Sequence, residues 1–205
     1  MEQILDENRA VLTGAVLTEP EFSHKTYGES FYIITLGVTR KSGYEDCIPL
    51  MISEKLLCGY EMNAGDMVTV SGQVRTYNRQ CDGRNHLMIV VFVKSWDYVP
   101  ECTEMENEVL LEGYICKETI RRTSPLGREL CDIMLAVNRM YNKSDYIPCI
   151  AWGRNAIYAG ELNVGDKIYI EGRLQSRTYR KYDECGMPTE KIAYEVSVTH
   201  MGIDE

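Results

Sequence analysis

The chain has 205 residues and a formal net charge of −9, with 44% apolar residues, 14 tyrosines and 3 phenylalanines. This length suits one large or two small domains, and the apolar fraction is sufficient for a packed core. No apolar run approaches the ~20 residues of a membrane helix, and the N-terminus lacks the pattern of a secretory signal, so we expect a cytoplasmic protein. Its eight scattered cysteines and three histidines form no C-x-x-C pair and no zinc-binding spacing. We therefore expect free thiols and predict neither a metal nor a cofactor.

The chain repeats itself when it is shifted by 99 residues, without a gap over about forty positions. After one inserted residue, the match continues at a shift of 100, so the spacing of the glycines and the alternation of apolar residues agree together. We predict two copies of one unit, over residues 1–100 and 107–205, joined by a short acidic linker at 101–106. Matched positions include Asn8 and Asn107, Gly14 and Gly113, Arg40 and Arg139, Asp46 and Asp145, and Gly72 and Gly172.

The first copy is predicted to contain five strands and one helix. Strands are expected over 10–17, 31–39 and 47–52, where apolar residues alternate with polar ones or form a short buried run. Gly14 inside the first strand indicates a bulge or a sharp bend. A helix is expected over 53–62 with Ser53 as its N-cap, followed by strands around Gly72 and over 87–99. The polar segment 76–85 is predicted to be the hairpin loop between these last two strands.

The second copy repeats this order, with strands over 109–116, 130–138, 146–152, 167–175 and 192–201, a short helix from Asn155 and a polar loop over 178–190. Five strands with one helix between the third and the fourth is the order of an OB-fold. The predicted fold class is therefore all-β, with two tandem OB-folds that each form a five-stranded Greek-key barrel. Bent first strands suit such a barrel, because its sheet closes on itself.

Large aromatic residues alternate with arginines and lysines over residues 145–182. A buried run ends on Trp152-Gly153-Arg154, and a later strand leads into Arg177-Thr178-Tyr179-Arg180-Lys181-Tyr182. A positive groove with exposed rings holds single-stranded nucleic acid, because it contacts phosphates and stacks bases. A strand with a tyrosine-rich solvent face explains this segment, taken alone, equally well.

Four motifs of the second copy follow one another in order: Thr123-Ser124-Pro125-Leu126-Gly127, Leu135-Ala136-Val137-Asn138-Arg139, Ile150-Ala151-Trp152-Gly153-Arg154 and Ile170-Glu171-Gly172-Arg173-Leu174-Gln175. Through these motifs the second copy resembles the bacterial single-stranded DNA-binding protein family. The resemblance implies an OB-fold that binds single-stranded DNA without reading its sequence, homodimers with four OB-folds, and contacts with other replication proteins. The residues that it implies for base stacking or phosphate contact are Trp152, Tyr179, Tyr146, Tyr141, Arg139, Arg154, Arg173, Arg177, Arg180, Lys181, Arg121 and Arg122. Tyr182 is a further stacking candidate, because it follows Arg180 and Lys181.

The first copy keeps less of this pattern. Ser53 stands where the second copy has Trp152, and Cys47 stands where it has Tyr146. We therefore expect the second copy to bind nucleic acid more tightly than the first. Acidic residues outnumber basic ones in both copies, 13 to 9 in residues 1–100 and 18 to 13 in residues 101–205, so a basic groove must be local. The stacking candidates that remain in the first copy are Tyr77 and Tyr44, and its candidate cations are Arg40, Lys41, Arg75, Arg79 and Arg84.

The leading hypothesis is a non-catalytic single-stranded DNA-binding protein of DNA replication, repair or recombination. The alternative is a primosomal-type replication scaffold, which binds nucleic acid weakly and acts mainly through protein–protein contacts; the acidic net charge and the altered first copy favour it. Competing structural interpretations are that Trp152 caps the core and that the arginines form surface ion pairs. The sequence contains no carboxylate pair with matched cations and no phosphate-binding glycine loop, so we do not predict an enzyme.

Overall fold

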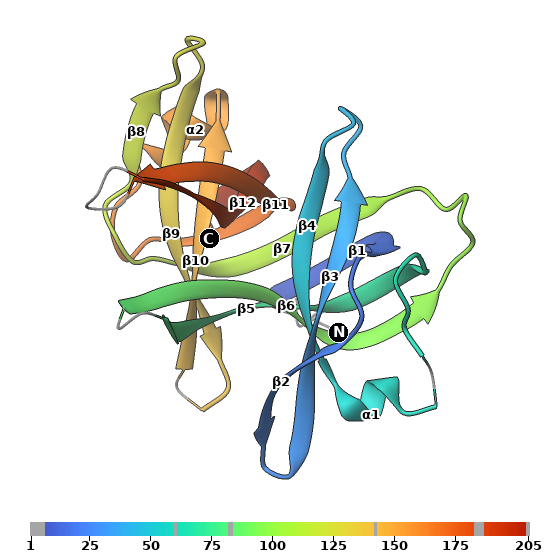
Figure 1. The fold of residues 1–205 in the computed structure, drawn as a ribbon. Helices are drawn as coiled ribbons and strands as arrows, with labels where there is room; N and C mark the ends of the chain where they lie inside the picture. The colour runs from blue at the N-terminus through green and yellow to red at the C-terminus, as the bar shows by residue number, and fades with distance from the viewer. Residues whose placement is uncertain (1–6, 60, 82–83, 142, 183–186, 204–205) are drawn as a thin grey trace, which may run out of the picture.

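The computed structural model describes residues 7–59, 61–81, 84–141, 143–182 and 187–203, and for residues 79–81, 84–86 and 181–182 it describes the backbone alone. Strands dominate these residues, as predicted, and no described helix has the length and apolar character needed to cross a bilayer. The elements, shown in Figure 1, are β1 (Asn8–Val16), β2 (Glu21–Thr26), β3 (Glu29–Thr39), β4 (Glu45–Ser53), α1 (Glu54–Leu57), β5 (Met67–Cys81), β6 (Arg84–Tyr98), β7 (Glu106–Ile115), β8 (Ile120–Thr123), β9 (Glu129–Arg139), β10 (Lys143–Trp152), α2 (Arg154–Ala159), β11 (Lys167–Tyr182) and β12 (Pro188–Ile203).

The strands form one hydrogen-bonded sheet that closes on itself twice. In residues 8–98, here called the first half, the pairings run β1–β3–β4–β6–β5 and return to β1, and β4 and β6 are parallel. In residues 106–203, the second half, they run β7–β9–β10–β12–β11 and return to β7, and β10 and β12 are parallel. Because the order of pairing is the same, equivalent positions of the repeat lie at equivalent places in the two rings.

A close crossing of strands closes the first ring. β1 pairs with β5 over residues 10–15 and turns to β3 at residues 15 and 16. A Cβ atom on Gly14 would overlap the carbonyl oxygen of Gly37 on β3, so only glycine fits there. The predicted irregularity at Gly14 is thus a strand crossing, and the bulges of the two rings lie further along the chain, at Gly72 and Gly172.

The strands extend beyond the predicted ones. Segments 76–85 and 178–190 are not loops, because β5 pairs with β6 as far as Cys81 and Arg84, and β11 pairs with β12 as far as Tyr182 and Pro188. Their polar composition reflects hairpin arms that leave the core and face solvent. The edge strands β2 and β8 are not predicted either, because all of their residues are exposed and the sequence shows no apolar alternation.

The first helix is shorter than predicted. Ser53 caps it as expected, since its hydroxyl oxygen accepts a hydrogen bond from the backbone N–H of Lys55 at 3.1 Å. The helix ends at Leu57 instead of Met62, and Gly59 follows with a φ of +86°. A glycine in this conformation is a common stop signal just past a helix.

Strands β1 and β7 join the two halves as antiparallel neighbours. Ala10 lies opposite Val109, its own counterpart in the repeat, and Asn8 lies opposite Leu111. The same register places Leu12 opposite Asn107, so the two halves are related by an approximate twofold axis between Ala10 and Val109. In Figure 1 the hairpins β3–β4 and β9–β10 accordingly point in opposite directions.

Hairpin β3–β4 is fixed to the second half by a buried carboxylate, which we call the Asp46 clamp. One oxygen of Asp46 accepts a hydrogen bond from the backbone N–H of Ser176 on β11 at 2.7 Å. Both oxygens accept hydrogen bonds of 2.6 Å from the guanidinium of Arg40. The backbone N–H of Cys47 donates to the Ser176 hydroxyl at 3.1 Å. The Asp46 side chain is fully buried, so this carboxylate depends on both halves for its partners.

Hairpin β9–β10 makes the equivalent contact with the first half, the Asp145 clamp. Asp145 accepts a hydrogen bond from the backbone N–H of Thr76 on β5 at 2.6 Å. Its other oxygen lies 2.9 Å from Nε of Arg139, and its side chain is also fully buried. The backbone N–H of Tyr146 donates to the Thr76 hydroxyl at 3.0 Å. Each half therefore holds a long strand of the other half.

We expect Asp46→Ala to lower the free energy of unfolding by about 3 kcal/mol, because Arg40 and the N–H of Ser176 lose a buried partner. Urea denaturation followed by circular dichroism measures this change. Asp132→Ala is the matched control: Asp132 holds Arg122 through hydrogen bonds of 2.7 and 3.0 Å, but the two side chains are 40% and 50% exposed. Its loss should stay below about 1 kcal/mol, and equal losses would contradict the clamp.

Candidate nucleic-acid interface

The second half carries a groove of about 1160 Å³ on the face of its sheet that points away from the core. A row of residues in register crosses the sheet beneath it: Asp132 on β9, Ile150 on β10, Ser197 on β12 and Arg173 on β11. Alternate residues of a strand face opposite sides, and Cys149, next to Ile150, points into the core. The ring of strands thus brings together side chains that are far apart in the sequence.

Trp152 forms one wall of this groove, at the end of β10. It shares a face of the strand with Ile150, which is almost fully buried on the groove floor. The Trp152 side chain is 38% exposed and does not belong to the core cluster of the described residues. Gly153 turns the chain, with a φ of +56°, into α2, which begins at Arg154. An exposed indole next to a guanidinium is suited to stacking a planar base.

Arginines outnumber acidic residues along the groove. Six arginines and two glutamates line it, so the lining is positive although the chain carries a net charge of −9. Some of these arginines already have partners: Arg122 lies 2.7 Å from Asp132, and Arg177 lies 3.8 Å from Glu195. Exposed ion pairs are weak, so a phosphate can replace the carboxylate. The six arginines are Arg40, Arg122, Arg128, Arg154, Arg173 and Arg177.

Two charged groups of opposite sign lie low in the groove. Nε of Arg173 is buried without a hydrogen-bond partner, and burial lowers the pKa of this guanidinium, with a further decrease caused by the neighbouring charge of Arg40. An unsatisfied cationic donor favours an acceptor that arrives from solvent. Glu195 opposes it: its carboxylate accepts a hydrogen bond from Gln175 at 2.8 Å and faces Arg177. On the groove floor, Arg173 therefore attracts a polyanion and Glu195 repels it.

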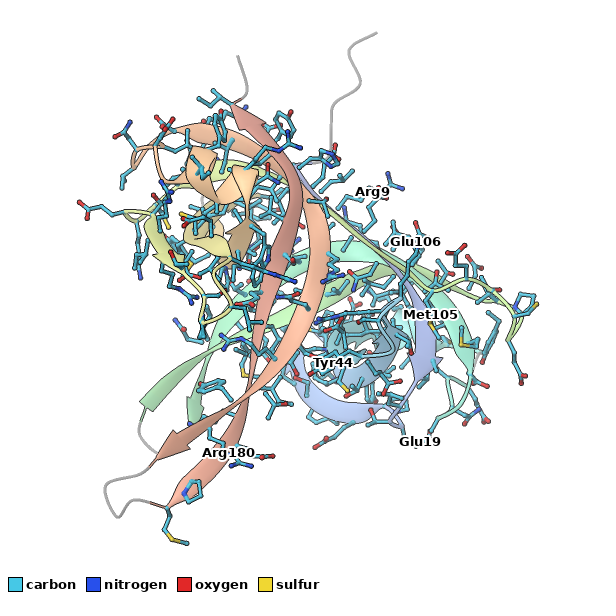
Figure 2. The ribbon with its side chains drawn as sticks, turned by 90° about the horizontal axis from the view of Figure 1, so that it is seen from above. Arg9, Glu19, Tyr44, Met105, Glu106 and Arg180 are labelled. Atoms are coloured by element: carbon cyan, nitrogen blue, oxygen red, sulfur yellow. The ribbon has the colours of Figure 1, made fainter. Side chains whose placement is uncertain are left out.

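The long strand β11 carries predicted residues beyond the floor. Tyr179 lies two positions after Arg177, on the same face of β11, and 38% of it is exposed. Nε of Arg180 lies 3.6 Å from Glu190 across the hairpin. Figure 2 shows Arg180 on the arm that β11 and β12 extend away from the rest of the chain. The side chains of the predicted residues Lys181 and Tyr182, also on β11, lie outside the described part of the structure.

Arg139, Tyr141 and Tyr146 lie away from the groove, contrary to the grouping that the sequence suggests. All three belong to the β9–β10 hairpin, which reaches the first half instead. Arg139 is part of the Asp145 clamp, and the backbone of Tyr146 is bonded to Thr76. Tyr141 is 89% exposed in the connecting turn, with a φ of +65°. None of these three residues lines the groove described above.

The equivalent face of the first half is closed by apolar packing. Phe31, Met51 and Val90 form a small buried cluster, and Tyr77 packs against it. By strand register, Met51 and Val90 stand at the places of Ile150 and Glu195 in the second half. The face that carries a basic groove in one half is therefore filled with apolar side chains in the other. Arg79 follows on β5, and its side chain is outside the described residues.

Arg128, Arg40 and Tyr44 line the groove although the sequence assigns none of them to it. Arg128 lies in the turn between β8 and β9, directly after a motif of the family pattern, and that position is a usable signal. Arg40 and Tyr44 are assigned by the sequence to a site of the first copy, because a contact between the halves leaves no local pattern. The predicted Arg121 instead pairs with Glu129 at 2.8 Å and is not a lining residue.

Known proteins resemble the chain in sequence and in fold. The model of the "Single-strand binding protein family" matches residues 106–204. The single-stranded DNA-binding protein of Clostridium tetani is 33% identical over 104 residues, which cover 47% of this chain and 72% of that protein. The one from Thermus thermophilus is 25% identical over 195 residues, covering 82% and 74%. The chain spans about half, 54%, of the length of a further relative, single-stranded DNA-binding protein 2 of Listeria innocua.

A solved structure extends the likeness to both halves. A deletion mutant of the single-stranded DNA binding protein from Thermus aquaticus matches with a TM-score of 0.75, over 97% of this chain and 94% of that one. The sequence identity is 20%, so the similarity concerns the fold. Because 97% of the chain is covered, the match extends into the first half, which lies outside the match to the family model.

The arginines around Trp152 should attract anions to its indole. In a Trp96→Phe variant, Trp152 is the remaining indole, and we compare its quenching by the anion iodide with its quenching by neutral acrylamide. We expect the ratio of iodide quenching to acrylamide quenching to be higher than for free indole, and inert salt to lower this ratio. The control is Trp152→Phe, which leaves Trp96, whose Nε1 donates to the Leu56 carbonyl at 2.9 Å outside the groove. The same preference for iodide in both variants would count against a positive groove.

Proposed function

Because the chain belongs to the single-strand binding protein family, we propose that it binds single-stranded DNA without reading the base sequence, in DNA replication, repair or recombination. The observation that carries this proposal is the groove of the second half, where the exposed indole of Trp152 lies among arginines. Stacking is tolerant of sequence, because every base has a flat face. Contacts to phosphates carry no sequence information either.

In this proposal the phosphates follow the arginines and the bases turn towards the rings. Arg154 and Arg177 offer exposed guanidinium groups at the groove wall, and Arg173 offers an unsatisfied donor at its floor. Trp152 stacks one base, and Tyr179 stacks another further along β11. Counterions leave the phosphates when the arginines bind them, so affinity falls as salt is added.

The proposal extends to the architecture and the assembly. We infer that each half is an OB-fold, in which five strands form a barrel; the closed rings of pairings and the likeness to the Thermus aquaticus structure support this.

We further propose a homodimer, which unites four such units and binds other replication proteins. The described cysteines are free thiols, as suits a reducing cytoplasm. Contacts for a strand that leaves the groove are proposed at Arg180, Lys181, Tyr182, Arg121, Tyr141 and Tyr146.

We expect an oligothymidine of about thirty nucleotides to quench the fluorescence of the Trp96→Phe variant and to bind tightly with a steep salt dependence. Trp152→Ala should weaken binding by about 1–3 kcal/mol, roughly 5- to 150-fold, because one stacked base is lost. Fluorescence anisotropy of a labelled oligonucleotide, measured at two salt concentrations, provides the affinities.

The matched control for this substitution lies in the first half. Tyr77→Leu combined with Arg79→Ala should change the affinity little, because the face of the first half is closed by apolar packing. A loss as large as that of Trp152→Ala would reverse the assignment of the tighter site to the second half. Weak binding of the unmodified chain with little salt dependence would favour the alternative function, a replication scaffold that acts through protein contacts.

Glu195→Gln is expected to tighten binding about three- to tenfold at low salt, because it removes a negative charge from the groove floor. The introduced amide can still accept a hydrogen bond from Gln175. Glu112→Gln makes the same change of charge on β7, where the carboxylate pairs with Lys167 outside the groove, and should have little effect. If both variants bind like the unmodified chain, the strand does not pass over Glu195.

A further inference from the structure

The first half completes the groove of the second half. Its lining residues include Arg40 and Tyr44, which flank the turn between β3 and β4. The backbone N–H of Arg40 donates to the carbonyl oxygen of Tyr44 at 2.8 Å and closes this hairpin. Figure 2 shows Tyr44 beside β11, where that strand passes the first half. A hairpin of one half thus reaches the candidate interface of the other.

Arg40 is already committed to the Asp46 clamp. Its two hydrogen bonds to Asp46 raise the pKa of the guanidinium and balance its charge. Its Nη2 also donates to the carbonyl oxygen of Ser176 on β11 at 3.5 Å. Because these contacts hold the guanidinium against the second half, Arg40 is a positioning residue for its neighbours rather than a strong phosphate ligand.

The ring of Tyr44 rests on this fixed guanidinium. The Cζ atom of Arg40 lies 4.6 Å from the ring centroid, a cation–π contact. Tyr44 nevertheless remains 46% exposed and lines the groove. A ring that is supported on one side and accessible from a groove can stack a base with little loss of conformational freedom.

We propose that Tyr44 stacks a base of the strand held in the groove of the second half, so that one binding site is built by both halves. This inference rests on the proposed function. Trp152 on β10 and Tyr44 on the crossing hairpin stand on opposite sides of the floor, with β12 and β11 between them. A strand that stacks on Trp152 and crosses the floor over Ser197 and Arg173 arrives at Tyr44.

The reciprocal hairpin, β9–β10, approaches a closed face of the first half. Lys143 stands at the repeat position of Tyr44, and the face that hairpin β9–β10 approaches is filled by Phe31, Met51 and Val90. Both hairpins therefore carry a clamp aspartate, but only hairpin β3–β4 lies against an open groove. It gives the first half a part in binding that its own closed face does not provide.

Substitutions at Tyr44 test this inference with an oligothymidine of about thirty nucleotides. We expect Tyr44→Ala to weaken binding about 5- to 150-fold, as the loss of one stacked base does, and Tyr44→Trp to retain the affinity. Tyr114→Ala is the matched control, because Tyr114 on β7 is exposed to a similar degree but lies outside the groove; its affinity should not change. Urea denaturation of each variant verifies that stability is preserved.

A spectroscopic readout then reports contact directly. In a chain with Trp96→Phe and Trp152→Phe, the indole introduced by Tyr44→Trp should be quenched when the oligonucleotide binds. Unchanged affinity of Tyr44→Ala, alongside a loss in Trp152→Ala, overturns the shared site and leaves the proposed function standing. Failure of the unmodified chain to bind overturns both.

Discussion

Two buried carboxylates, each bonded to a backbone amide of the opposite half, determine how this chain is arranged. Burial of Asp46 and Asp145 would be strongly unfavourable without partners. Each carboxylate pairs with an arginine of its own half, Arg40 or Arg139, and accepts a hydrogen bond from a backbone amide on β11 or β5 of the other half. Separation of the halves would remove the amide from each of them. Together with the β1–β7 ladder, the clamps hold the hairpins β3–β4 and β9–β10 in crossed positions. The groove, which includes Arg40 and Tyr44, exists in its observed form only because of this crossing.

The same frame supports two different surfaces. In the second half, Ile150, Ser197 and Glu195 form the floor of an open groove on the outer face of the sheet, and Trp152 and arginines stand around it. In the first half, apolar side chains at the equivalent places, Met51 and Val90 among them, cover the face with a second small core. Backbone topology alone therefore says little about binding. A few substitutions on the outward positions decide whether a ring of strands offers a groove or a packed surface.

The repeat, the order of the strands and the Ser53 cap were predictable, because each leaves a local pattern: a shift of 99 residues, alternating apolar positions, and a hydroxyl before a helix. The exposed strands β2 and β8 leave none. Trp152 and Arg154 were identifiable from the motif that ends β10, and the structure brings both to the groove. Arg139 and Tyr146 were grouped with them by the family resemblance. Their contacts with Thr76 in the other half belong to the tertiary structure, which no spacing along one copy reveals.

The number of arginines overstates the positive charge that the groove can offer to a phosphate. Arg40 is balanced by a buried carboxylate, and Arg122 is held by Asp132 through two hydrogen bonds. Arg154 and Arg128 have no such partner among the described hydrogen bonds and ion pairs, and Arg173 has a buried nitrogen without an acceptor. A phosphate that binds the paired arginines must first displace a carboxylate, which reduces the gain. In the proposed function, this arrangement favours phosphate contact at the few unpaired cations, next to the exposed ring of Trp152, and gives an acidic chain a locally positive track for a polyanion.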